Sequence, residues 1–375
     1  MTSLSKPLAG IKLLDLTRLL PGPMATRHLA DLGAIVIKIQ SPDALQADYA
    51  KTMGQPSDMT GTGDARASYF YQHCNAGKQE LTLDLKLPAD KAHFLELVRT
   101  ADAVLESFRP GVMARLGLAF EVLQAVNPAI SLISISGYGQ QGAWAGAAGH
   151  DINYMALSGM LHEFCAANME SLPLPNIQYG DLLGGAMTAA FATTAAILHS
   201  KIHGVGCWMD VSMTASLLAH NVMPLFATQA RGAPTPADMD LLNGGVPCYS
   251  AYRTADGRFL AVGALELKFW QSFCAVIARP DWAVKHWSLG NLDIGNSDSM
   301  LLKAQVADLI ASQSLADWVA LFAGHDCCVT PVLRMDEALA HPVNTEYGSV
   351  AYREVMGSNQ TLRNIPTVTR ALKRI

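Results

Sequence analysis

The chain has 375 residues and a net charge of −5, and half of its residues are hydrophobic while only 16% are charged. A chain of this length and apolar content can bury a large core and is long enough for two domains. Charges of both signs are scattered without a basic block, which argues against a surface for nucleic acid or for a lipid membrane.

The first 200 residues alternate short apolar runs with helical patterns. Strand patterns occupy 11–17, 34–39, 81–85, 103–106 and 130–136, and helical patterns occupy 21–32, 88–100 and 120–126. Pro21 and Pro23 suit the first turn of a helix. Strands that alternate with helices predict a parallel sheet covered on both faces, so the expected fold class is α/β with a Rossmann-like sheet.

From Gly146 onward the pattern becomes mainly helical and then changes to a smaller α+β unit. Helices are predicted at 151–164, 182–199 and 213–228, with one strand at 208–211. Two strand patterns at 249–254 and 259–262 flank Ala255-Asp256-Gly257, which is a turn signal for a hairpin. Helical patterns at 266–277, 300–312 and 315–322 and a strand pattern at 328–333 complete this unit.

These patterns predict two domains. A large α/β domain spans 1–203 and is completed by 350–375, and a small α+β domain spans 248–332. The linker between them covers 204–247, whose second half is rich in Gly, Pro and Asp, and a return linker covers 333–349. Residues 43–66 lack periodicity and are expected to form a long loop.

The terminal and cysteine patterns favour a cytoplasmic protein. The segment MTSLSKPLAGIKLLDL lacks the layout of a signal peptide, and the seven cysteines suit free thiols in a reducing compartment. The most apolar stretch, 184–198, is shorter than the roughly 20 residues of a membrane span, so a buried helix and no membrane partner are expected. The vicinal pair Cys327-Cys328 is not by itself a tetrahedral metal site, so no metal is expected.

The start of the predicted sheet lacks the glycine motif of common dinucleotide-binding enzymes. No G-x-G-x-x-G follows the first strand and no G-x-x-x-x-G-K-[ST] is present, which argues against a nicotinamide cofactor. The G-x-S-x-G motif of a serine nucleophile is also missing.

Three short segments instead place polar residues at predicted helix starts. His150 and Asp151 open one helix, Asp181 precedes an otherwise uncharged helix, and Glu266 follows the hairpin. Each carboxylate suits a capping role or the first helical turn, and His150 suits a surface position. The same positions also suit a catalytic site, because N–H groups at a helix start bind negative charge and can hold an enolate oxygen. Residue types alone leave both interpretations open.

Cations follow several predicted strands, namely Lys38, Lys78, Lys86, Arg109 and Arg115. An α/β sheet binds ligands beyond the carboxyl ends of its strands, so Arg109 is well placed to hold a phosphate. A solvated surface charge is the alternative for each of them.

Short blocks between residue 7 and about residue 350 together match one enzyme family. They are Pro7–Ile11, Asp15–Thr17, Pro21–Pro23, Asp31–Ala34, Asn75 with Lys78, Leu83–Lys86, and, most specifically, Glu106–Val112 followed by Arg115–Leu118. On these blocks the chain resembles the family III CoA-transferases, and within them the α-methylacyl-CoA racemases.

One segment favours the racemase branch. Transferases of the family usually carry an aromatic residue where His150 stands in Gly149–Tyr154. Further racemase-like blocks are Asn243–Pro247, Asp256–Arg258, Gly263–Glu266 and Asp326–Val332. The chain departs from the family at Ile39-Gln40-Ser41, where an acidic or basic residue is often found, and in the length of the 43–66 loop.

The resemblance implies roles for particular residues. His150 and Asp181 match the two acid/base residues, and Asp151 and Glu266 match positions that support the histidine. CoA contacts are implied at Leu83, Asp84, Leu85, Lys86, Ser107, Phe108, Arg109, Arg115, Gly149 and Tyr154. The resemblance also implies that CoA is part of the substrate rather than a cofactor. It further implies an interlocked homodimer whose active sites lie between one subunit's large domain and the other's small domain.

The expected reaction is epimerisation of 2-methylacyl-CoA thioesters through an enolate. Neutral His150 takes the α-proton on one face while Asp181 donates a proton on the other, and the reverse direction exchanges the roles. The helix start after Asp181 would hold the enolate oxygen, and Gly184 and Gly185 would let the substrate approach the backbone. The alternatives are a CoA-transferase that uses Asp181 as its nucleophile, through anhydride and thioester intermediates, and a non-catalytic acyl-CoA-binding protein.

Overall fold

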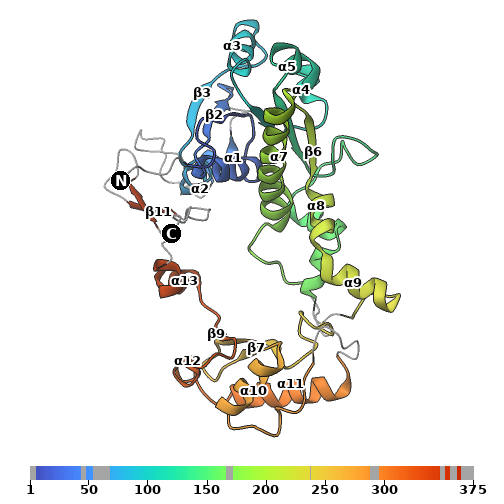
Figure 1. The fold of residues 1–375 in the computed structure, drawn as a ribbon, viewed down its shortest axis with the longest axis vertical. Coiled ribbons are helices and arrows are strands. Elements are labelled where there is room, and N and C mark those ends of the chain that lie inside the picture. The colour runs from blue at the N-terminus through green and yellow to red at the C-terminus, as the bar shows by residue number, and fades with distance from the viewer. Residues whose placement is uncertain are drawn as a thin grey trace. The chain divides into compact units, whose positions relative to one another are not determined.

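The computed structural model describes residues 6–43, 48–53, 68–165, 172–236, 238–287, 295–346, 351–354 and 361–364 (Figure 1). The chain divides into two compact units. The first unit contains Met1–Met160, Pro175–His220 and Glu346–Ile375, and the second contains Leu161–Leu174 and Asn221–Thr345.

A six-stranded parallel sheet forms the centre of the first unit. Its strands lie in the order β3 (Gln79–Thr82), β2 (Ile35–Gln40), β1 (Lys12–Asp15), β4 (Ala103–Glu106), β5 (Ser131–Ser136) and β6 (Trp208–Ser212). All five pairings are parallel, which confirms the predicted α/β class. The strand order reverses between β1 and β4, and in open α/β sheets the ligand crevice lies at such a reversal.

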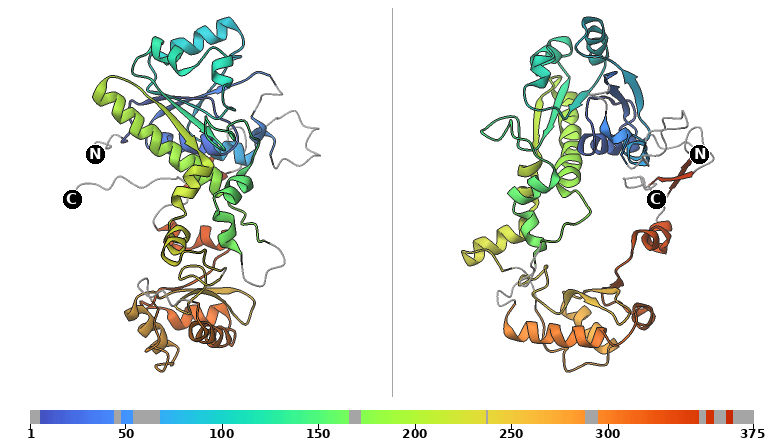
Figure 2. Two further views of the ribbon diagram at one scale, coloured as in Figure 1. Left: turned by 90° about the vertical axis from the view of Figure 1, so that its right-hand side faces the viewer. Right: turned by 180° about the vertical axis from the view of Figure 1, so that it is seen from behind.

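Helices on the sheet explain why its central strands are apolar. Strands β4 and β5 are buried at every position, as expected when both faces are covered. Helices α1 (Pro21–Asp31) and α7 (Thr188–His203, the long green helix in Figures 1 and 2) contact the strands directly. Helices α3 (Pro88–Val98) and α5 (Phe120–Val126) add Phe94, Val98 and Leu123 to a core cluster with residues of β1, β4 and β5.

Shorter elements complete the first unit. They are the 3₁₀ turn η1 (Tyr49–Lys51), α2 (Tyr69–Cys74), α4 (Val112–Arg115), α6 (Asp151–Leu157), the π-helical η4 (Gly180–Met187), α8 (Met213–His220), and the antiparallel pair β10 (Ala351–Glu354) and β11 (Thr361–Asn364). Much of the predicted 43–66 loop, and most of the 350–375 segment expected to complete the large domain, lie outside the described residues.

Elements η4 and α7 run on as one helix from Gly180 to His203, which is longer than the apolar stretch singled out in the sequence. By length and composition this helix could cross a membrane, with a mean hydropathy of 1.4 over its most apolar window. Half of that window is buried inside the protein, where the helix contacts α1, β5, β6 and α8. Because the core helix of a soluble protein meets the same criteria, these contacts favour a core helix.

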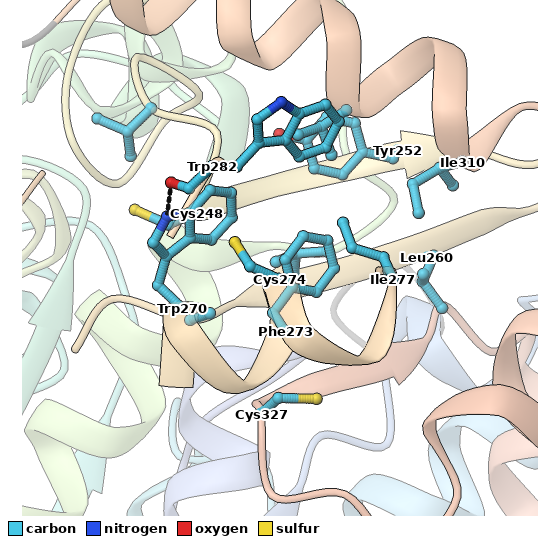
Figure 3. Close-up of a cluster of buried hydrophobic side chains, with 14 of the residues drawn as sticks. Cys248, Tyr252, Leu260, Trp270, Phe273, Cys274, Ile277, Trp282, Ile310 and Cys327 are labelled. Carbon is cyan, nitrogen blue, oxygen red and sulfur yellow. Dashed lines mark hydrogen bonds between the residues drawn. The ribbon is translucent and has the colours of Figure 1, made fainter. Parts of the chain in front are cut away.

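The second unit is built on a three-stranded antiparallel sheet, β7 (Tyr249–Arg253), β8 (Phe259–Gly263) and β9 (Val329–Pro331). The predicted hairpin between the first two strands is confirmed. Helices α10 (Leu267–Val276), α11 (Ser297–Ile310) and α12 (Leu315–Phe322) supply side chains to its core. Figure 3 shows this core, in which Trp270 stacks on Phe273 and donates its indole N–H to the carbonyl of Trp282 at 3.1 Å.

Two predicted helices end earlier than expected. The helix predicted over 151–164 stops at Leu157, because Gly159 adopts a left-handed conformation and a separate 3₁₀ turn, η3 (Met160–Phe164), follows. The helix predicted over 213–228 breaks at Asn221 into α8 and α9 (Val222–Arg231). Pro224 accounts for the break, since its ring is tolerated in a first turn but would clash with the carbonyl of residue 220 in a continuous helix.

The stretches predicted as linkers contain regular structure. Strand β6 and helices α8 and α9 lie within 204–247, and α13 (Met335–Ala340) and α14 (Pro342–Thr345) lie within 333–349.

Candidate active site

The starts of α6 and η4 are joined by a hydrogen bond. Asp151 stands in the first turn of α6, and its Oδ1 accepts the backbone N–H of Asp181 at 2.8 Å. The backbone of Gly180 also hydrogen-bonds the Asp151 carboxylate. Asp151 therefore caps the start of η4 from outside, and two of the predicted site residues lie together.

His150 immediately precedes this pair along the chain. It is the N-cap residue of α6, and its backbone N–H donates to Asn153 Oδ1 at 3.0 Å. The His150 side chain is exposed. This geometry holds the backbone at the helix start and leaves the imidazole accessible to a ligand.

The Asp181 carboxyl group has an unusual proton affinity. Burial raises its pKa to about 7, and the negative charge of Asp151 adds to the increase. Burial also raises the pKa of Asp151, although the N–H groups of Asp181 and Gly180 partly oppose that change. A carboxyl group with a pKa near neutrality is suited to both donating and accepting a proton in catalysis.

Two tyrosines and a glycine support the segment before His150. The Tyr154 hydroxyl donates to the carbonyl of Gly149 at 2.6 Å, and its ring meets Tyr138 edge-on at 5.4 Å. A Cβ at Gly149 would lie 2.5 Å from the Tyr138 hydroxyl and 2.8 Å from the Tyr154 ring. The close fit requires glycine here, and it fixes the path of the chain into His150.

The start of η4 does not provide the oxyanion site predicted from the sequence. The N–H of Asp181 is bonded to Asp151, and the N–H of Leu182 donates to the carbonyl of Gln178 at 2.8 Å. A Cβ at Gly184 would lie 2.7 Å from the carbonyl oxygen of Met213. Gly185 likewise packs on α1, where its Cβ would lie 2.6 Å from the Pro21 side chain. The two glycines therefore serve helix packing rather than substrate approach.

Glu266 lies in the second unit. It is the N-cap residue of α10, with extended backbone angles and an exposed side chain. Its support of His150 stays a prediction.

A cavity of about 660 Å³ opens at the carboxyl ends of β1, β2, β3 and β4. Eight of the ten residues implied as CoA contacts line it: Leu83, Asp84, Leu85, Lys86, Ser107, Phe108, Arg109 and Arg115. The other two, Gly149 and Tyr154, belong to the α6 segment instead. Residues that the sequence analysis did not select as ligand contacts complete the lining: Leu16, Thr17, Arg18, Lys38, Ile39, Gln40, Ser41, Asp48, Val112 and Leu116.

The side of the cavity formed after β3 and β4 is cationic. Lys86, Arg109 and Arg115 line it with exposed side chains, and the guanidinium of Arg18 lies 5.6 Å from the centre of the Phe108 ring. Such a cluster suits the phosphates of a nucleotide, because guanidinium and ammonium groups form charge-assisted hydrogen bonds with them.

Comparison with known proteins assigns the chain to a family. The model of the family described as CoA-transferase family III matches residues 8–371. The chain belongs to CoA-transferase family III.

Curated relatives in the family carry different activities in their names. Human α-methylacyl-CoA racemase is 35% identical over 347 residues, covering 91% of this chain and 82% of the relative. The acetyl-CoA:oxalate CoA-transferase of Acetobacter aceti is 32% identical over 338 residues, covering 90% and 83%. A crystal structure of a probable fatty acyl-CoA transferase from Mycobacterium tuberculosis is 26% identical, with a TM-score of 0.76 over 98% of this chain and 93% of that one.

This family III member has a buried ion pair at the end of β1. Lys78 Nζ lies 3.0 Å from Asp15 Oδ2, and both side chains are fully buried. Burial alone would raise the pKa of Asp15, but Lys78 and Lys38 lower it to about 2, so the carboxylate stays charged. Lys78 also donates to the carbonyl of Pro23 and to Asn75 Oδ1. It therefore serves the fold and is not a free cation for a ligand.

A second buried carboxyl group, Glu106, supports the cavity wall. Its Oε2 accepts the backbone N–H of Phe108 at 2.7 Å, and it also hydrogen-bonds the Ser134 hydroxyl. Ser134 in turn accepts the indole N–H of Trp208 at 2.9 Å. Burial raises the pKa of Glu106 to about 7. Sequence reasoning assigned Glu106 to the family block but missed this role, which depends on contacts between three strands.

Proposed function

We propose that the protein epimerises 2-methylacyl-CoA thioesters by moving the α-proton through an enolate. The supporting observation is the accessible His150 beside the Asp151–Asp181 pair, where Asp181 has a pKa of about 7. Proton transfer on two faces of one carbon needs two groups that exchange protons near neutral pH, and a histidine and a raised carboxyl group meet that need. The identity to human α-methylacyl-CoA racemase also supports the proposal.

In the proposed mechanism the two residues act in turn. Neutral His150 removes the α-proton and becomes an imidazolium, whose positive charge stabilises the adjacent enolate. Protonated Asp181 then delivers its proton to the opposite face, and the reverse reaction exchanges the roles. Burial keeps a large part of Asp181 protonated at neutral pH, as a proton donor requires.

The CoA portion would occupy the cavity at the strand ends. Phosphates would bind the cations on its β3 and β4 side, and this remote binding energy would hold the α-carbon between the two acid/base groups. CoA then belongs to the substrate and is not a separate cofactor.

We also propose a cytoplasmic homodimer. The helix from Gly180 to His203 carries an exposed apolar stripe at Met187, Phe191, Leu198 and Ile202, with Phe191 77% exposed. The spacing of four, seven and four residues puts these side chains on one face of the helix. An exposed apolar stripe of this kind is typical of a subunit interface. Light scattering coupled to size-exclusion chromatography tests this, and a strictly monomeric protein would contradict it.

CoA transfer is the second candidate function. Family relatives named as CoA-transferases reach 32% identity over most of the chain. Asp181 could serve there as the nucleophile, attacking the thioester carbonyl to form an anhydride and release CoA.

One experiment separates the two reactions. A single epimer of a 2-methylacyl-CoA is incubated in D₂O without an acceptor acid, with deuterium at the α-carbon followed by NMR and the epimer ratio by chiral analysis. The wild type is compared with His150→Ala, Asp181→Asn and the remote control His93→Ala, whose side chain is exposed on α3.

Deuterium uptake with epimerisation, lost in both site variants and retained in the control, supports the epimerase. A thioester that stays unchanged until a free carboxylic acid is added, with CoA then moving to that acid, overturns it in favour of the transferase.

A further inference from the structure

A buried ion pair forms part of the cavity wall after β2. Lys38 is 1% exposed and Asp48 is 4% exposed, and both line the cavity. Lys38 Nζ donates to the carbonyl of Thr17 at 2.7 Å and lies 3.4 Å from Asp48 Oδ2. The pair is thus held from two sides and carries no net charge.

The two oxygens of Asp48 are used unequally. Oδ1 accepts the backbone N–H groups of Leu19 and Ala50, each at 3.1 Å. Oδ2 is buried and has no hydrogen-bond partner among the described residues, since Lys38 is close enough for charge attraction but makes no aligned hydrogen bond to it. A buried oxygen that is ion-paired but accepts no hydrogen bond keeps unused acceptor capacity, which in a cavity wall points to a donor on a ligand.

Electrostatics decide which part of a CoA thioester can supply that donor. A phosphate at this wall would face a carboxylate oxygen, whereas Arg109 and Arg115 offer it a cationic side of the same cavity. The group beside Asp48 is therefore neutral and carries an N–H or O–H.

The surroundings of Asp48 suit a flat, mostly apolar ring. Ile39, Leu83 and Leu85 line the cavity and are each less than one-tenth exposed. Gln40, at the end of β2, donates its amide to the Tyr71 hydroxyl, which donates to Glu80 at 2.7 Å. A fixed, neutral amide therefore lies at this end of the cavity, as expected beside a neutral part of the ligand.

We propose that Asp48, held in place by Lys38, accepts a hydrogen bond from the adenosine of CoA. The donor is the exocyclic amine of adenine or the 2′-hydroxyl of the ribose. This inference rests on the proposed function, because it requires a CoA thioester in the cavity. It adds a residue that selects the nucleotide end of the substrate.

Calorimetric binding to the full-length protein tests the assignment with four probes. These are CoA, adenosine 3′,5′-bisphosphate, its inosine counterpart, which replaces the amine with a carbonyl, and its 2′-deoxy counterpart. The variant is Asp48→Asn, in which Oδ1 can still accept both backbone N–H groups while an N–H₂ replaces Oδ2. Glu121→Gln on α5 is the matched control, because it removes one carboxylate charge from the same unit outside the cavity lining.

We expect Asp48→Asn to weaken CoA and adenosine bisphosphate by about tenfold or more, with Glu121→Gln unchanged. If adenine supplies the donor, the inosine probe binds the wild type weakly, and its affinity does not fall further in Asp48→Asn. If the ribose supplies it, the 2′-deoxy probe shows that behaviour instead.

Two outcomes overturn the inference while leaving the proposed function intact. In one, Asp48→Asn binds CoA as tightly as the wild type. In the other, Asp48→Asn weakens the binding of all four probes by the same factor, which would indicate a general disturbance of the cavity wall. A wild type that binds none of the probes refutes CoA binding itself, and the assignment of Asp48 falls with it.

Discussion

The backbone N–H of Asp181 donates to the side chain of Asp151 over 2.8 Å, so one carboxylate caps the helix that carries the other. The bond fixes the start of η4 against the start of α6, where His150 is the N-cap residue. It also brings two negative charges close together, which contributes to the high pKa of Asp181. The same contact thus caps the helix and helps to raise the pKa of the carboxyl group at its start.

The raised pKa of Asp181 predicts a pH-dependent stability. Between the ordinary carboxyl pKa of 3.8 and the folded-state value of about 7, the folded protein binds a proton that the unfolded chain has lost. Its contribution to the free energy of unfolding is therefore complete below pH 4 and is lost as pH rises through 7. The free energy of unfolding is measured in urea at pH 4.5 and 7.5 for the wild type and for Asp181→Asn. Relative to the wild type, the variant should be more stable at pH 7.5 than at pH 4.5 by about 1 to 2 kcal/mol, after allowance for partial solvent exposure. A difference that does not change with pH contradicts the raised pKa.

Replacement of Arg109 should weaken substrate binding more than turnover. The side chain lines the cationic side of the cavity, so Arg109→Ala removes a charge-assisted bond to phosphate and should raise the KM for a CoA thioester about tenfold or more, with a smaller change in kcat. The control is Arg99→Ala, an exposed arginine that pairs with Glu96 and does not line the cavity. Equal KM values for the two variants would count against a phosphate at Arg109.

Glu106→Gln should disturb the cavity wall even though the two side chains have nearly the same shape. The carboxyl group interacts with the Phe108 N–H and with Ser134, whose oxygen already accepts the N–H of Trp208. A glutamine must turn an N–H₂ toward one of these donors, so we expect a loss of about 1 to 3 kcal/mol in the free energy of unfolding and weaker CoA binding. Thermal unfolding and calorimetry measure both, with Glu121→Gln as the control. Wild-type values for both quantities would show that the buried network is dispensable.

Gly149→Ala should impair catalysis while sparing CoA affinity. The added Cβ would lie 2.5 Å from the Tyr138 hydroxyl, so the chain must shift just before His150. Since Gly149 is not part of the cavity lining, we expect kcat to fall at least tenfold with a small change in the dissociation constant of CoA. Gly146→Ala is a suitable control, because its Cβ would meet nothing within 4 Å. If both variants keep wild-type kcat, the position of His150 does not depend on this contact.

Features that depend on residues close together in the sequence could be predicted. Apolar runs marked the parallel strands, and Pro21 and Pro88 marked the first turns of α1 and α3. The cavity residues at 83–86 and 107–109 follow strand ends directly, so chain pattern and family resemblance together found them. The break at Asn221 was missed in the sequence, although Pro224 marks it, since a proline is not tolerated in the interior of a continuous helix.

Features that depend on distant contacts were not predictable. Lys38 and Asp48 are ten residues apart in the sequence, and Lys78 and Asp15 are 63 apart, so no periodic pattern in the sequence indicates either ion pair. The same holds for Gly184 and Gly185, whose neighbours on α8 and α1 decide that they pack rather than receive a substrate. The capping of η4 by Asp151 likewise spans 30 residues.

The continuous helix from Gly180 to His203 has one further consequence. Its first turn holds Asp181, and its length carries the apolar stripe at Met187, Phe191, Leu198 and Ile202. The stripe and Asp181 therefore belong to one continuous element, which packs against α1 and α8. A partner subunit that covered the stripe would thus contact the same helix that carries Asp181 in its first turn.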